Sequence, residues 1–97
     1  MKALRRRYGR ATVRDKVYEF GRTRVAVRYD KLHDEYRGEL SWPEVSDNGV
    51  ESPRIRHHLI TRLPASHITF GPEAPLYAAA AKMVHTSGIP EFLWAAA

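Results

Sequence analysis

Two segments that alternate apolar and polar residues flank the dipeptide Gly21-Arg22, and this arrangement constrains the fold more than any other feature of the chain. A glycine at the first central position of a two-residue connection is typical of a type II′ turn, which joins antiparallel strands. We therefore predict a β-hairpin with strands over about residues 12–20 and 23–29. Because a two-residue turn fixes the register, the sequence specifies each cross-strand pair.

This register separates the side chains by chemistry. The face that we expect to be covered carries apolar residues, namely Tyr18, Phe20, Val25, Val27 and Tyr29. The other face carries two pairs of opposite charge, Asp15 with Arg28 and Glu19 with Arg24. A shift of one residue would lose both patterns, because it moves every side chain to the opposite face. We expect the two carboxylates to neutralise the two arginines.

A third strand is predicted over about residues 36–42, where apolar and polar residues alternate again. Pro43 is expected to end this strand, because proline cannot donate to the backbone ladder. A polar, acidic loop is predicted after it, with a turn at Asp47-Asn48-Gly49. Three consecutive antiparallel strands form a meander.

In the C-terminal half, the sequence predicts helices over about residues 53–63, 75–87 and 90–95. Residues 75–87 carry an apolar stripe and an alanine run, and Gly88 comes directly after them. Residues 53–63 follow Ser52, which can cap a helix, and begin with Pro53, which suits its first position; isoleucine and leucine recur at helical spacing. An edge strand is the alternative for this segment. The predicted fold class is α+β, a three-stranded meander packed against two or three helices.

The chain has 97 residues, which permits one core and one domain. We expect a basic, flexible arm over residues 1–11 and a single small domain over 12–97. Cysteine is absent, which excludes disulfides and thiolate metal sites and fits a reducing compartment. No apolar stretch is long enough to span a bilayer. We expect a cytoplasmic protein that needs no cofactor or metal.

Positive charge is concentrated at the N-terminus, where residues 1–14 hold six basic residues and no acid. Guanidinium groups bind phosphates in bidentate geometry, and Tyr8 could stack on an unpaired base. The sequence therefore predicts a non-enzymatic protein that binds DNA or RNA mainly through phosphate and shape. The predicted contacts are Arg5, Arg6, Arg7, Tyr8, Arg10 and Arg14. Two alternatives stay open: a solvated leader without a partner, or an arm that docks on the acidic segment 34–51 of the same or a second chain.

A protein-interaction module is the second hypothesis. The chain would then act as a small regulator or inhibitor, of the type that phages and mobile elements carry, and would bind a larger protein or nucleoprotein complex. The candidate surfaces are the arm, the acidic loop with Glu44 and Asp47, and a C-terminal aromatic group with Phe92 and Trp94. An exposed strand edge could also pair two copies of the chain.

Two His-x-Thr/Ser tripeptides, His67-Ile68-Thr69 and His85-Thr86-Ser87, carry the enzymatic alternative. They resemble the paired motifs of the 2H phosphoesterase family, which implies an acid and a base at His67 and His85 and phosphate-binding hydroxyls beside them. The resemblance covers these six residues only. That family has a longer, two-lobed chain in which the motifs lie far apart.

At the level of topology, three antiparallel strands followed by a helix resemble the DNA-binding domains of the phage-integrase arm-type and AP2-like class. The resemblance covers about residues 12–86 and implies a sheet that enters the major groove. Here, however, Asp15 and Glu19 are expected on the exposed face of the sheet, so no binding residue is carried over from that class.

Overall fold

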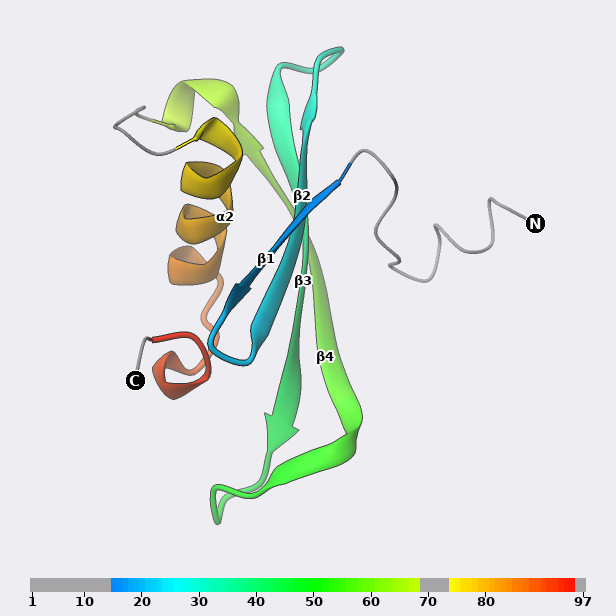
Figure 1. Cartoon of the computed structure of the whole chain (residues 1–97), viewed down its shortest axis with the longest axis vertical. Coiled ribbons are helices and arrows are strands. Elements are labelled where there is room, and N and C mark those ends of the chain that lie inside the picture. The colour runs from blue at the N-terminus through cyan, green and yellow to red at the C-terminus, as the bar shows by residue number, and fades with distance from the viewer. Residues whose placement is uncertain (1–14, 69–73, 96–97) are drawn as a thin grey trace, which may run out of the picture.

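The computed structural model describes residues 15–68 and 74–95, which form an antiparallel sheet covered on one face by a helix (Figure 1). The sheet has four strands in the order β1-β2-β3-β4. The fold class is therefore α+β, as predicted, with one more strand and fewer α-helices than expected. The elements are β1 (Lys16–Phe20), β2 (Thr23–Asp30), β3 (Glu35–Val45), β4 (Glu51–Pro64), the 3₁₀ helix η1 (Ala65–His67), α2 (Pro75–Thr86) and the 3₁₀ helix η2 (Glu91–Leu93).

The predicted hairpin register is confirmed. Strands β1 and β2 pair from Lys16 with Val27 to Phe20 with Thr23. Gly21 has a φ of +58°, as the first central residue of a type II′ turn requires. The turn chemistry of the sequence thus determined which side chains share a face.

The core lies between the sheet and α2. From the sheet it receives side chains of β2 and β3, and from α2 it receives Ala79, Ala80, Met83 and Val84. Gly38 of β3 lies beneath the helix, where a Cβ would overlap the Met83 sulfur. The glycine therefore lets the helix approach the sheet closely. The sheet residues of this core are Val25, Val27, Tyr36 and Leu40.

The helix predicted over residues 53–63 is wrong, and the alternative of an edge strand is confirmed by β4. Strand β4 pairs with β3 over most of its length. Leu59 and Leu63 pack against the core, whereas Ile55 and Ile60, which helical spacing placed beside them, are exposed. Tertiary pairing overrides the helical pattern here, because the backbone N–H and C=O groups of β3 need a partner along their second edge.

Pro43 does not end the third strand. Strand β3 continues to Val45, and Pro43 pairs with Arg56 of β4. The register shifts between Pro43 and Val45, which is how a strand accommodates a residue without an N–H donor. The predicted acidic loop is shorter than expected and spans residues 46–50, with the turn at Asp47-Asn48-Gly49 as predicted. A hydrogen bond of 2.9 Å from Ser46 N to Val50 O closes it.

The helix predicted over 75–87 is confirmed by α2, whereas residues 90–95 form only the one-turn η2. Leu93 of η2 is buried, and its carbonyl oxygen accepts hydrogen bonds from Arg22 N at 2.9 Å and from Thr23 Oγ1 at 3.0 Å. The C-terminal turn is thereby fixed to the end of the first hairpin. Among the described segments, no helix has the length and apolar character that a bilayer crossing requires.

Candidate nucleic-acid interface

The six side chains predicted to contact nucleic acid lie outside the described residues. They are Arg5, Arg6, Arg7, Tyr8, Arg10 and Arg14. The chain runs from them through Asp15 into β1, which is one edge of the sheet. The basic segment therefore joins the body at a sheet edge.

The described part of the chain is electrically balanced. Residues 15–68 and 74–95 contain ten Lys and Arg and ten Asp and Glu. The remaining six basic residues all precede residue 15, and the one remaining acid is Glu73. The net charge of +5 therefore originates in residues 1–14.

Three arginines form a row across the face of the sheet opposite α2. The register places Arg28 of β2 beside Arg37 of β3, and Arg37 beside Arg62 of β4. Each guanidinium has a carboxylate partner, so the row is an ion-pair network rather than free positive charge. The pairs are Arg28–Asp15, Arg37–Asp30, Arg37–Glu35 and Arg62–Glu35, with N–O distances of 4.0, 2.9, 3.2 and 3.6 Å.

Asp30, His33 and Glu35 form the group of candidate metal ligands in the described segments, with ligand atoms within 4.8 Å of one another. These atoms already have partners. His33 Nδ1 lies 2.7 Å from Asp30 Oδ2, and Arg37 bridges both carboxylates. The hydrogen bond from His33 lowers the pKa of Asp30 and keeps it charged. A guanidinium therefore occupies the position that a cation would need.

Glu39 lies at the centre of the same face, between Ala26 of β2 and Ile60 of β4. Its Oε2 atom is buried and accepts no hydrogen bond. Burial raises the pKa of Glu39, and the charge of Asp15 raises it further, against the opposing effect of Arg28 and His58. Burying a carboxylate without a hydrogen-bond donor costs stability, so this position destabilises the sheet.

Arginines without a salt-bridge partner among the described residues gather at the end of the sheet that holds the Gly21 turn. Arg24, Arg54 and Arg56 form no salt bridge with any described carboxylate. Glu19 is the cross-strand partner of Arg24, as predicted, but both side chains are exposed and the expected neutralisation is absent. Water competes effectively for charges at such positions.

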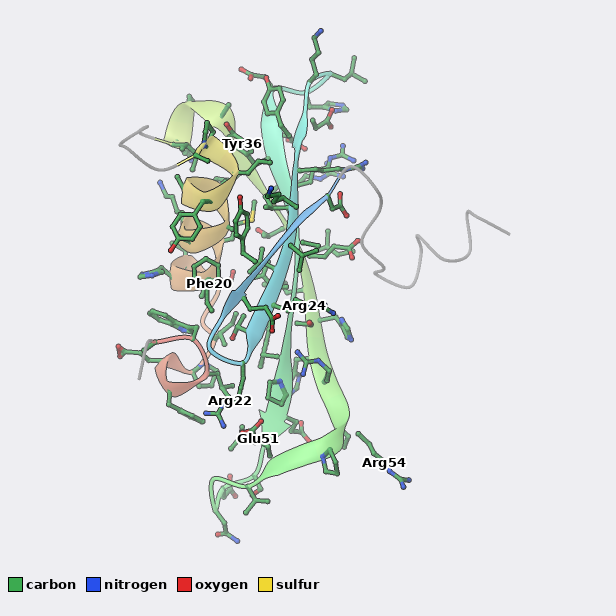
Figure 2. The ribbon with its side chains drawn as sticks, in the orientation of Figure 1. Phe20, Arg22, Arg24, Tyr36, Glu51 and Arg54 are labelled. Atoms are coloured by element: carbon green, nitrogen blue, oxygen red, sulfur yellow. The ribbon has the colours of Figure 1, made fainter. Side chains whose placement is uncertain are left out.

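A hollow of about 530 Å³ lies beside Arg24 and Arg56. Arg56 donates a hydrogen bond of 3.3 Å from Nη2 to Ser41 Oγ. Arg22 forms a salt bridge with Glu51, which ties the first hairpin turn to the start of β4, as Figure 2 shows. The lining residues are Glu19, Gly21, Arg22, Arg24, Ser41, Pro43, Glu51 and Arg56.

The two acidic candidates for protein binding lie near the β3–β4 turn. Glu44 is half-buried and pairs with His57, with 3.1 Å between Oε1 and Nε2. Asp47 is exposed in the turn itself. Asp47 is therefore in the more exposed position of the two.

The two aromatic candidates have different environments. Phe92 is 56% exposed, with the Arg22 guanidinium 5.9 Å from the centre of its ring. Trp94 is half-buried, its Nε1 donates to Ile89 O at 2.9 Å, and its ring centre lies 4.4 Å from that of His85. Trp94 thus holds the C-terminal turn in place, and Phe92 is the more accessible of the two aromatic side chains.

The histidines of the phosphoesterase resemblance lie on different elements. His67 ends η1, and its carbonyl accepts a hydrogen bond of 2.9 Å from Lys82 Nζ, whereas His85 is in the last turn of α2. Thr69 lies outside the described residues. The hydroxyls of Thr86 and Ser87 donate to carbonyls of α2, at 2.8 and 2.5 Å. These two hydroxyls are therefore engaged by the helix and do not form a phosphate site.

Sequence reasoning missed the arginines of β4, because the segment was assigned to a helix. A signal was present, since Arg54, Arg56 and His58 alternate with other residues at a spacing of two, which on a strand places them on one face.

No protein-family model, curated protein or solved structure matches this chain.

Proposed function

We propose that this chain is a small, non-enzymatic nucleic-acid-binding protein whose Arg-rich N-terminal segment contacts the phosphate backbone. The observation that supports the proposal is the charge balance of the body. Because residues 15–68 and 74–95 sum to zero, the surplus charge of the chain is held by a single segment of fourteen residues. Such a concentration of arginine suits phosphate recognition, which requires charge and bidentate donors rather than a shaped pocket.

Recognition of this kind is mostly independent of base sequence. Six phosphate contacts from this segment would contribute about −4 to −5 to the slope of a plot of log affinity against log salt concentration. Tyr8 adds a stacking contact worth about 1–3 kcal/mol, which forms only where a base is unpaired. We therefore propose that single-stranded regions bind more tightly than duplex of equal charge.

The test is binding of labelled DNA and RNA oligonucleotides over a series of salt concentrations. The intact chain is compared with a chain lacking residues 1–10, which removes five of the six basic residues. The truncated chain should bind far more weakly, with a slope less steep by about 3.5–4.5. Equal binding by the two chains, or no binding by the intact chain, would refute the proposal.

Two further variants make the test specific. Replacing Arg5, Arg6, Arg7 and Arg10 together by glutamine keeps the length and Tyr8, and should reproduce most of the loss. Lys82→Gln removes one charge from α2 and serves as the matched control, which should leave binding unchanged. Tyr8→Ala should weaken binding to single strands and spare binding to duplex.

A protein-interaction module is the second candidate, supported by exposed apolar side chains at one end of the body. Val50 is 65% exposed and Phe92 is 56% exposed, and the Arg22–Glu51 salt bridge connects their segments. A partner protein would be lost on Phe92→Ala or Asp47→Asn, with the fold retained. Tyr77→Ala, which alters an exposed aromatic residue on α2, is the control.

A further inference from the structure

We propose that Arg24, Arg54 and Arg56, termed the body patch, form a second phosphate-binding surface for the same nucleic acid that residues 1–14 contact. This inference rests on the proposed function and names the part of the folded body that takes part. It commits the body patch to phosphates of a nucleic-acid backbone.

The pairing of the arginines distinguishes the body patch from the rest of the sheet. The described residues contain seven arginines, of which four have carboxylate partners: Arg22, Arg28, Arg37 and Arg62. The three arginines without such a partner in the described part all lie near the end of the sheet that holds the Gly21 turn. An ion-paired arginine must first lose its carboxylate before it can bind a phosphate, whereas these three are accessible to one.

The backbone register brings Arg24 and Arg56 to one face. Ser41 of β3 pairs with Arg24 of β2 on one side and with His58 of β4 on the other. Arg56 is hydrogen-bonded to the Ser41 hydroxyl, so Arg24 and Arg56 flank one polar group. Arg54 precedes Arg56 by two residues and lies where the β3–β4 register shifts, so it adds positive charge next to this pair without sharing its register. Figure 2 shows Arg54 extending away from the β4 ribbon into the surroundings.

Two carboxylates, Glu19 and Glu51, also line the hollow beside the body patch, and a free carboxylate there would repel a phosphate. Glu51 is engaged by Arg22, which cancels its charge locally. Glu19 is exposed and opposite Arg24. The guanidinium groups of Arg24 and Arg56 and the Ser41 hydroxyl remain as donors, an arrangement suited to a tetrahedral anion with several acceptor oxygens.

The separation between the body patch and the point where the N-terminal segment joins the body favours a polymeric ligand, which can contact both. Residues 1–14 join the body at the start of β1, and the body patch lies at the other end of that strand. A strand of this length spans about 17 Å, which equals the rise of about five nucleotides along one strand. A nucleic acid can reach both sites at once, and two linked contacts bind more tightly than either alone.

A second copy of the chain fits this surface poorly. Strand β4 is an open edge of the sheet, but residues 52–64 contain no acid. Antiparallel pairing of two β4 strands would therefore set basic side chains against basic side chains over this length, which opposes association.

The experiment uses the full-length chain with Arg24, Arg54 and Arg56 each replaced by glutamine, singly and together. Each lost contact should reduce the steepness of the salt plot by about 0.7–0.9 and weaken binding about five- to eightfold near 0.1 M salt. The triple variant should therefore bind about a hundredfold or more weakly. Lys82→Gln on α2 is the charge-matched control, and unfolding curves verify that each variant is folded.

The outcomes separate the two proposals. The body patch is refuted if the triple variant binds with the same affinity and slope as the intact chain. The proposed function still stands in that case, provided that the intact chain binds nucleic acid and the truncated chain does not. If the intact chain does not bind, both fail. If polyglutamate binds as tightly as the oligonucleotides and depends on the same three arginines, the body patch recognises acidic protein surfaces and the inference is also overturned.

Discussion

Replacing Gly21 by alanine should destabilise the protein by about 2–5 kcal/mol, because two costs add at this position. The φ of +58° disfavours any residue with a Cβ, by about 1–2 kcal/mol. The added Cβ would also lie 3.0 Å from the Leu93 carbonyl oxygen, which is backbone and is held by hydrogen bonds from Arg22 and Thr23. Such overpacking costs about 1–3 kcal/mol more.

Gly49 supplies the matched control. Its φ of +80° is also in the region that favours glycine, but a Cβ there meets no atom within 4 Å. Gly49→Ala should therefore show the backbone cost alone, about 1–2 kcal/mol. The gain from a less flexible unfolded chain applies to both variants and cancels in the comparison. The difference between the variants measures the docking of η2 on the hairpin turn.

Chemical denaturation monitored by circular dichroism gives the two free energies of unfolding, and thermal midpoints should fall by about 4–8 °C for each kcal/mol. Hydrogen exchange of the Arg22 amide, which donates to Leu93 O, should accelerate in Gly21→Ala beyond the change in global stability. Equal destabilisation by Gly21→Ala and Gly49→Ala, or a larger effect of Gly49→Ala, would refute the reasoning.

Two further predictions concern the centre of the sheet. Gly38→Ala should lower the free energy of unfolding by about 1–3 kcal/mol, because its Cβ would overlap the sulfur of Met83, which is 2% exposed. A double-mutant cycle with Met83→Ala should show strong non-additivity. Additive free energies of unfolding would contradict the contact. Burial raises the pKa of Glu39, so the folded state holds that proton more tightly and stability falls as the pH rises above the ordinary value of 4.5. Glu39→Gln should remove this loss of stability with rising pH and raise the free energy of unfolding at neutral pH. An unchanged pH profile of stability in this variant would contradict the role given to Glu39.

Local signals predicted much of the fold. The Gly21 turn and the flanking alternation predicted the β1–β2 register, because a two-residue connection leaves little freedom in how the strands meet. Residues 75–87 carried consistent helix signals throughout, and α2 formed there. The second half of the sheet was not predictable in this way. Residues 53–63 combine a plausible helix start with β-branched residues, and the choice between them depends on whether β3 offers an unpaired edge.

In the candidate interface, too, some features follow from the sequence and others only from the fold. The concentration of arginine in residues 1–14 is a property of the sequence, and so is the near balance of charge over residues 15–97. Which arginines of the body are free of a carboxylate partner is a property of the fold. Glu19 and Arg24 are paired in the register yet form no salt bridge, whereas Arg37 bridges Asp30 and Glu35. Side-chain pairing depends on solvent exposure and on neighbours from other strands, which spacing along one strand does not specify.

The sequence by itself determined the first hairpin, the α2 helix and the location of the surplus charge, since each depends on residues that are close along the chain. Tertiary structure decided that residues 51–64 complete the sheet, that Pro43 lies within a strand, and that Arg24 and Arg56 share one face. These features join segments up to about thirty residues apart. Their formation depends on the closing of long loops and the burial of a shared core, which local propensity does not encode.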